Sequence, residues 1–136
     1  MTLMEWDATK FELAVPKMDD QHKKLIDIMN RLYDRHHANA AKPELDKLLI
    51  ELRNYTLLHF REEEALLEKM QFPQYARHKL IHEQLLTDFS KHYQAFAAGN
   101  GEISSAFFDF LRLWLTSHIM HIDRKYSEFS RQHHAA

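Results

Sequence analysis

Histidines continue the apolar faces of the helices that this sequence predicts, which makes them candidates for metal binding. In four segments hydrophobic residues recur three or four positions apart, and the same faces also carry imidazole or carboxylate groups. These inward polar residues are His22, His59, Glu63, His78, His82 and His118. A buried ionisable group costs free energy unless it is paired or binds a metal, so this set needs a common explanation.

Two of the segments carry a pair of such residues one helical turn apart. His59 and Glu63 are four residues apart, and so are His78 and His82, which places each pair on one helix face. A single pair of this kind is expected by chance in a chain with 11 histidines. Two inward pairs, together with a histidine on each of the other segments, predict a metal site between four helices.

Asp123 is a further candidate ligand, but its spacing does not suit a regular helix. It follows His118 by five residues, which corresponds to about 140° around an ideal helix. A π-bulge would bring the two side chains toward one centre, and such bulges are frequent at functional sites. We therefore predict a local distortion between His118 and Asp123. The alternative is that Asp123 is a solvated charge beside Arg124 and Lys125.

Four helices behind an N-terminal arm are the elements that must position these residues. Only two Gly and three Pro occur in the chain, which favours long helices over many strands. The arm is expected over residues 1–18, and the predicted helices span residues 19–37, 43–70, 74–98 and 103–129. Asp19 is the expected N-cap of the first helix, and Gly99–Asn100–Gly101 is the clearest turn. Short connections predict an all-α, antiparallel up-down four-helix bundle, as a single domain over residues 1–136.

Composition and charge exclude several classes of protein. The formal net charge is −2, so we expect no nucleic-acid partner. There are no cysteines, which excludes disulfides and thiolate metal sites. No signal peptide is expected in residues 1–10, and the most apolar stretch, residues 107–115, is too short to span a membrane. We expect a cytoplasmic protein.

The motifs resemble those of the hemerythrin family, in particular its bacterial single-domain members, over nearly the whole chain. The matching residues are Trp6–Asp7, Phe11, Val15–Pro16, Asp19-Asp20-Gln21-His22, His59-Phe60-Arg61-Glu62-Glu63, His78-Lys79-Leu80-Ile81-His82, Trp114-Leu115-Thr116-Ser117-His118-Ile119 and Asp123-Arg124-Lys125-Tyr126. Seven ligand positions in the same order and spacing make the resemblance specific. One departure is Ala14, where many bacterial members have Gly.

The resemblance implies a centre of two iron ions joined by an oxo or hydroxo bridge. The ligands implied for one iron are His78, His82 and His118, and those implied for the other are His22 and His59. Glu63 and Asp123 would bridge the two ions. That ligand set leaves one coordination position open, on the iron with two histidines, where a small molecule can bind.

The resemblance also implies a function, which is reversible binding of dioxygen by a non-haem iron protein. It implies that the protein is not an enzyme. Neutral imidazoles support Fe(II), whereas ferritin-like di-iron enzymes surround their metals with about four glutamates and two histidines. A dry pocket would limit autoxidation. The positions that match the family's oxygen pocket are Leu25, Phe60, Trp114, Leu115 and Ile119, which also suit plain core packing. We expect Leu115 to limit access to the open position.

Three other interpretations use the same residues. The first is a di-iron enzyme with peroxide or nitric oxide chemistry, since the low carboxylate count argues only against an oxidase. The second is an oxygen or iron sensor module, although this chain ends soon after the last helix. The third is a zinc-bound or metal-free structural bundle, because imidazole suits several metals. Beyond dioxygen, a partner could be an oxygen-consuming client protein, which the residues do not identify.

Overall fold

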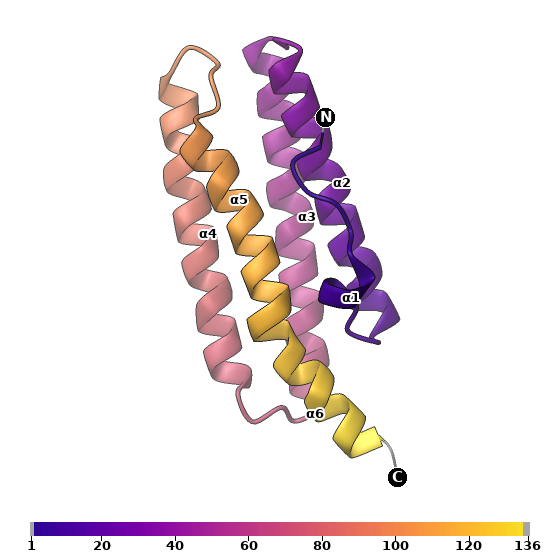
Figure 1. Ribbon diagram of the computed structural model, residues 1–136. Helices are drawn as coiled ribbons and strands as arrows, with labels where there is room; N and C mark the ends of the chain where they lie inside the picture. Colours follow the sequence, from indigo (N-terminus) through magenta and orange to yellow (C-terminus); the bar gives the residue numbers. More distant parts are fainter. Residues whose placement is uncertain (1, 135–136) are drawn as a thin grey trace.

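Long helices joined by short connections make up nearly all of the protein. The computed structural model describes residues 2–134. The bundle is made of four helical rods, each a single helix or a run of consecutive helices. Three of the rods are α2 (Pro16–His37), α3 (Lys42–Lys69) and α4 (Tyr75–Ala98). The fourth consists of α5 (Ser105–Ser117), η1 (His118–Asp123) and α6 (Arg124–His134). Consecutive rods run in opposite directions (Figure 1), which confirms the all-α, antiparallel up-down four-helix bundle.

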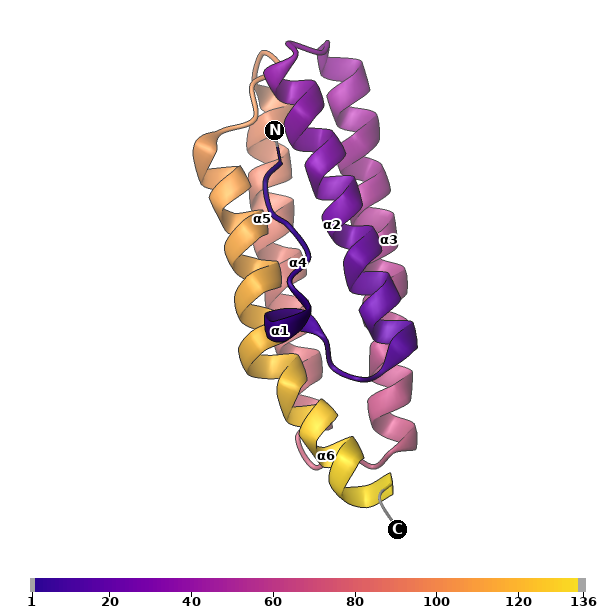
Figure 2. The ribbon, with the colours of Figure 1, turned by 45° about the vertical axis from the view of Figure 1, so that its right-hand side comes forward.

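The N-terminal arm lies along the bundle between α2 and the last rod (Figure 2). It contains a one-turn helix, α1 (Ala8–Phe11), which Asp7 caps by accepting a hydrogen bond from the N–H of Thr9. Leu13 is buried, and its N–H donates to Asp19 Oδ1 at 2.9 Å while its carbonyl accepts from the Ser127 hydroxyl. These two hydrogen bonds tie the arm to both α2 and α6.

The first long helix begins earlier than its sequence pattern suggested. Pro16 occupies the first turn of α2, where its missing N–H has no intrahelical partner to lose. The prediction that Asp19 is the N-cap was wrong, because Asp19 lies inside the first turn, is buried and accepts the N–H of Leu13. Residues 16–18 therefore belong to α2 and not to the arm.

The other predicted boundaries differ most in the last rod. α3 and α4 begin and end within one residue of the predicted positions, and α5 begins at Ser105 rather than at residue 103. The rod continues to His134, past the predicted end at residue 129. Phe129 packs against Phe72 with ring centroids 5.5 Å apart, which holds α6 against the α3–α4 connection.

The connection between α4 and α5 is the predicted glycine turn. Gly101 has a φ of 102°, a conformation that other residues rarely adopt. Lys42 Nζ donates to the carbonyls of Ala97, in the last turn of α4, and of its C-cap Gly99, which suits the negative end of the helix. Ser104 then caps α5 by accepting from the N–H of Phe107.

A continuous hydrophobic core fills the space between the rods. It is interrupted by a group of buried polar residues nearer the end of the bundle that holds the α3–α4 connection. Within residues 2–134, no helix has both the length and the apolarity needed to cross a bilayer.

Candidate metal centre

All seven predicted ligands lie inside the bundle, and each has an exposed fraction of at most 5%. Every rod contributes to the group. The contributing elements are α2 (His22), α3 (His59 and Glu63), α4 (His78 and His82) and η1 (His118 and Asp123). Apolar neighbours along each helix face pull these polar side chains inward, as the sequence pattern predicted.

A π-helix brings His118 and Asp123 together, which confirms the predicted distortion of the last rod. A π-helix has more residues per turn than an α-helix, so a spacing of five returns the side chain to nearly the same side. His118 Nε2 lies 3.0 Å from Asp123 Oδ1. Ile122, which a regular helix would turn inward, is only partly buried, while Asp123 is fully buried.

The Glu63 carboxylate presents its two oxygens to two different groups of imidazoles. Glu63 Oε1 lies 2.8 Å from His78 Nε2 and 3.0 Å from His82 Nε2. Glu63 Oε2 instead faces His59 Nε2 at 3.5 Å and His22 Nε2 at 3.8 Å. One carboxylate thus reaches two adjacent groups of imidazoles.

Asp123 divides its oxygens in the same way. Its Oδ1 lies 3.0 Å from His118 Nε2 and 3.2 Å from His78 Nε2, and its Oδ2 lies 3.2 Å from His22 Nε2. The histidines therefore form a three-histidine cluster (His78, His82 and His118) and a two-histidine cluster (His22 and His59). Both carboxylates lie between these two clusters.

These donors fit metal ions better than they fit one another. Both ring nitrogens of His22 and both side-chain oxygens of Asp123 are buried without a hydrogen-bond partner. His82 Nε2 and His118 Nε2 face each other at 3.3 Å, where two neutral imidazoles can share only one proton. Neighbouring donors around one ion lie about 3 Å apart when metal–ligand bonds are about 2.1 Å long. Imidazole and carboxylate donors suit iron among other metals.

Polar side chains accept a hydrogen bond from Nδ1, the ring nitrogen that points away from the cluster, in two of the histidines. His59 Nδ1 donates to Gln21 Oε1 at 2.6 Å, and His82 Nδ1 donates to Glu64 Oε2 at 2.8 Å. A proton on Nδ1 leaves the Nε2 lone pair free for a metal. Sequence reasoning missed both partners because each faces a histidine on another helix. Their only signal in the sequence is that each directly adjoins a predicted ligand.

The balance between burial and nearby charges keeps the two carboxylates ionised. Burial alone would raise the pKa of Glu63, but the surrounding imidazoles hold that pKa well below its usual range. The pKa of Asp123 is likewise lowered, because attraction to His118 outweighs the opposing effects of burial and of the Glu63 charge. Tyr126 donates its hydroxyl to Glu63 Oε2 at 2.9 Å, and burial beside that charge raises the pKa of Tyr126, so it remains a donor. Burial lowers the pKa of His59 to about 3, which keeps that imidazole neutral.

The five residues predicted to line an oxygen pocket are all buried. Phe60 stacks on His82 with ring centroids 3.7 Å apart and an interplanar angle of 4°. Trp114 meets the edge of Phe60 at a centroid distance of 6.0 Å. The remaining three, which belong to the same hydrophobic core, are Leu25, Leu115 and Ile119. Aromatic rings therefore cover one side of the three-histidine cluster.

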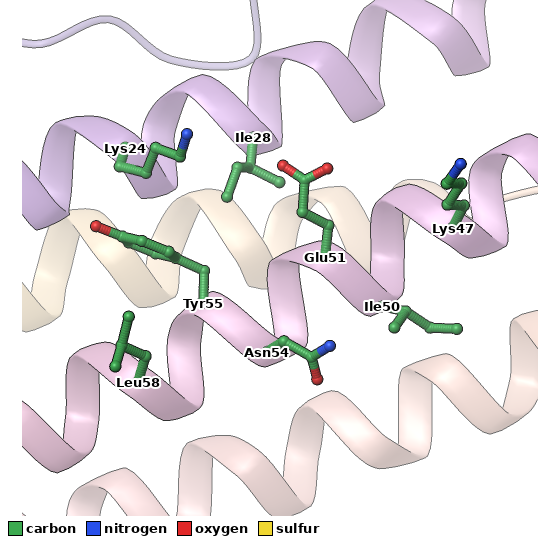
Figure 3. Close-up of a pocket in the computed structure, with 8 residues that line it drawn as sticks. All are labelled: Lys24, Ile28, Lys47, Ile50, Glu51, Asn54, Tyr55 and Leu58. Atoms are coloured by element: carbon green, nitrogen blue, oxygen red, sulfur yellow. The ribbon is translucent and has the colours of Figure 1, made fainter.

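A wide groove between α2 and α3 contains none of these ligands. Figure 3 shows the side chains that line it, which come from both helices. The groove has a volume of about 490 Å³ and is lined by Lys24, Ile28, Lys47, Ile50, Glu51, Asn54, Tyr55 and Leu58. The groove is therefore separate from the buried cluster of candidate ligands.

Residues 13–129 match the model of a known family, described as the Hemerythrin HHE cation binding domain. The chain belongs to the hemerythrin family. A bacteriohemerythrin of Methylococcus capsulatus is 35% identical over 126 residues, which cover 93% of this chain and 95% of that protein. A hemerythrin-like protein of Naegleria gruberi is 31% identical and covers 89% of this chain and 88% of its own length.

Solved hemerythrin structures share the same fold. The crystal structure of a wild-type hemerythrin superimposes with a TM-score of 0.85 at 34% sequence identity, covering 93% of this chain and 97% of that chain. A hemerythrin domain binds a di-iron centre, and the buried cluster of histidines with Glu63 is suited to hold it. Family membership therefore makes this a non-haem di-iron domain of the oxygen-binding type.

Proposed function

We propose that this protein binds dioxygen reversibly at its di-iron centre and serves as an oxygen carrier, store or delivery protein. In this proposal the three-histidine cluster would hold one iron, the two-histidine cluster would hold the other, and Glu63 and Asp123 would be shared by both. The observation that carries the proposal is the division of each carboxylate's oxygens between the two clusters. The iron of the two-histidine cluster has fewer protein ligands, so we assign the dioxygen position to it.

The donor set favours binding over oxidation. Five imidazoles and two carboxylates face the centre, whereas ferritin-like enzymes use about four glutamates and two histidines. The di-iron pair, when bound, would supply electrons to dioxygen on binding and would recover them when dioxygen leaves. Two carboxylates contribute less negative charge than four, so higher oxidation states gain less stabilisation from the protein. We therefore infer a binding protein and not an enzyme.

Buried apolar side chains support reversibility because they keep water away from the centre. Leu25 and Ile119 have an exposed fraction of 0%, and Leu115 has 1%. A dry site strengthens the electrostatic interactions of the buried carboxylates and limits side reactions with water. Leu115 is the residue to which we assign control of access to the dioxygen position.

Two further parts of the proposal concern the location of the protein in the cell and the protein to which it delivers oxygen. The absence of cysteine is compatible with a reducing cytoplasm, which we propose as its location. An oxygen-consuming client protein would suit the delivery role. Cell fractionation and co-purification with the iron-loaded protein test these two points.

The visible absorption spectrum of the iron-loaded protein tests the proposed function. The protein is reduced without air, exposed to air and then purged with inert gas. We expect a charge-transfer band that appears with air and disappears on purging. Replacing a predicted ligand, His118→Ala, should abolish the band, whereas His37→Ala, at an exposed position on α2, should retain it. Irreversible conversion to ferric protein would instead favour an enzyme or a sensor, and the lack of any iron band would contradict the metal assignment.

A further inference from the structure

A small cavity lies beside the predicted oxygen pocket, between α3, α4 and α5. Its volume is about 10 Å³, measured as the space available to the centre of a water molecule. Much of its wall is apolar, formed by Leu85, Leu86 and Phe89 of α4. Arg53 and Thr56 of α3 and Trp114 of α5 also line it, and all three carry polar atoms.

Two of these polar atoms are buried and have no partner. Thr56 Oγ1 and Trp114 Nε1 are inaccessible to solvent and make no hydrogen bond, and the two residues have exposed fractions of 4% and 7%. Unsatisfied buried polar groups are uncommon in folded proteins, and two of them beside one cavity indicate a missing partner.

The Thr56 hydroxyl lacks a hydrogen bond that another helical threonine of the same protein makes. Thr87 donates its hydroxyl to the carbonyl of Glu83, four residues back along α4, at 3.0 Å. Helical threonines commonly use that carbonyl. Thr56 makes no such bond, so its hydroxyl is left without a partner in a residue that lines the cavity.

We propose that this cavity binds one water molecule, held by Thr56 and Trp114. The indole N–H of Trp114 is only a donor, so the bound molecule must accept a hydrogen bond, whereas the Thr56 hydroxyl can donate or accept. One water needs about 10–15 Å³ of such space, which leaves no room for a larger acceptor. Dioxygen would leave both polar atoms poorly satisfied, whereas water satisfies both.

Phe60 separates the bound water from the metal centre. One face of its ring stacks on His82, and the ring also forms part of the cavity wall. The water would therefore lie behind the Phe60 ring, which stacks on His82 of the three-histidine cluster, on the outer side of the predicted oxygen pocket. Trp114 would take part in both regions, because its ring contacts Phe60 while its N–H would donate to the water.

A crystal structure of the iron-loaded protein, at a resolution that shows ordered water, tests the proposal. We expect isolated density within hydrogen-bond distance of Thr56 Oγ1 and Trp114 Nε1. Thr56→Val keeps the shape of the side chain but removes its hydroxyl, and should empty the site. Thr87→Val, the same change at an exposed helical position, should leave the density in place. An empty cavity in the parent protein, or a Thr56 hydroxyl bonded within α3, would overturn the proposal.

Xenon pressure on crystals of the parent protein provides a second way to overturn the proposal. Xenon bound between Thr56 and Trp114 would show that the cavity takes up an apolar gas and that the water assignment is wrong. Neither readout depends on dioxygen binding, so this proposal can fail while the proposed function stands.

Discussion

At the scale of single residues, the partner of each outer imidazole nitrogen shapes what the inner nitrogen can do. His82 has a carboxylate partner, Glu64, whereas His59 has an amide partner, Gln21. A carboxylate raises the basicity of the imidazole more than an amide does. The two clusters would therefore offer bound irons different electronic environments, through residues that are not themselves candidate ligands.

Glu64→Gln removes this negative charge while keeping an oxygen that can accept from His82. We expect iron affinity to fall by about 10- to 100-fold, the usual effect of losing such a partner. Competition with a chelator of known affinity measures the change. Glu68→Gln, an exposed position one turn further along α3, is the matched control. Equal affinities in the parent and in Glu64→Gln would show that His82 does not need the carboxylate.

Leu115→Ala opens space beside the centre at a residue that is 1% exposed. Water should reach the centre more easily, so the oxygenated protein should autoxidise faster than the parent. The substitution should also lower the free energy of unfolding by about 2–5 kcal/mol, because it leaves a cavity. Decay of the oxygenated spectrum in air measures the rate, with Leu113→Ala, at a position 60% exposed, as control. An unchanged decay rate in Leu115→Ala would exclude Leu115 as the barrier.

At the scale of elements, helix faces were predictable and contacts between helices were not. The predicted ligands follow apolar stripes, and the five-residue interval from His118 to Asp123 in the sequence indicated the π-helix. Gln21 and Glu64 depend on how neighbouring helices are rotated, which a single sequence does not reveal. The start of α2 was misplaced because Asp19 has the chemistry of an N-cap yet binds the arm instead.

The arm contains a residue in a conformation that favours glycine. Ala14 has a φ of 59°, and the left-handed region costs an L-residue about 1–2 kcal/mol. Ala14→Gly should remove that strain, although the added flexibility of the unfolded chain offsets about 0.4–1 kcal/mol. We expect a Tm increase of about 1–5 °C, measured by calorimetry. Ala38→Gly, at a φ of −86°, is the control and should lower Tm. Equal decreases in both variants would show that Ala14 is not strained.

An ion pair joins the end of α2 to the start of α3, where Arg35 binds Glu44. Its guanidinium lowers the pKa of Glu44 below the usual 4.5. A lowered folded-state pKa means that the pair stabilises the protein above pH 4.5 and that this effect is lost as the pH falls through the folded-state pKa. Glu44→Gln should therefore have a slightly lower Tm than the parent at neutral pH and the same Tm in acid.

Thermal melts of Glu44→Gln and the parent at neutral and acidic pH, in the same metal state, test this dependence. Glu128→Gln, at an exposed position on α6, controls for the loss of a carboxylate that has no such role. A Tm difference for Glu44→Gln that persists or grows in acid would contradict the assignment.

At the scale of the whole molecule, the bundle contains an ionisable cluster in the middle of an apolar core. Seven titratable side chains with exposed fractions of 0–5% would be costly to bury without a binding partner. All four rods contribute, so a metal bound there connects every helix of the bundle. Metal binding and folding should therefore be coupled.

Removal of iron should lower the stability of the whole protein. A ligand present at about 1,000 times its dissociation constant stabilises the folded state by about 4 kcal/mol. We expect the metal-free protein to unfold at least about 10 °C below the iron-loaded protein in calorimetry. Adding ferrous iron back without air should restore the higher Tm. Identical melting curves would mean that the cluster is stable without metal.

The most direct measurement is a crystal structure of the iron-loaded protein with diffraction data collected across the iron absorption edge. The account predicts two iron peaks inside the bundle, one bonded to the three-histidine cluster and one to the two-histidine cluster. Glu63 and Asp123 should each contribute one oxygen to each peak. A single peak, a peak outside these clusters, or a carboxylate bound to only one ion would contradict the shared di-iron centre.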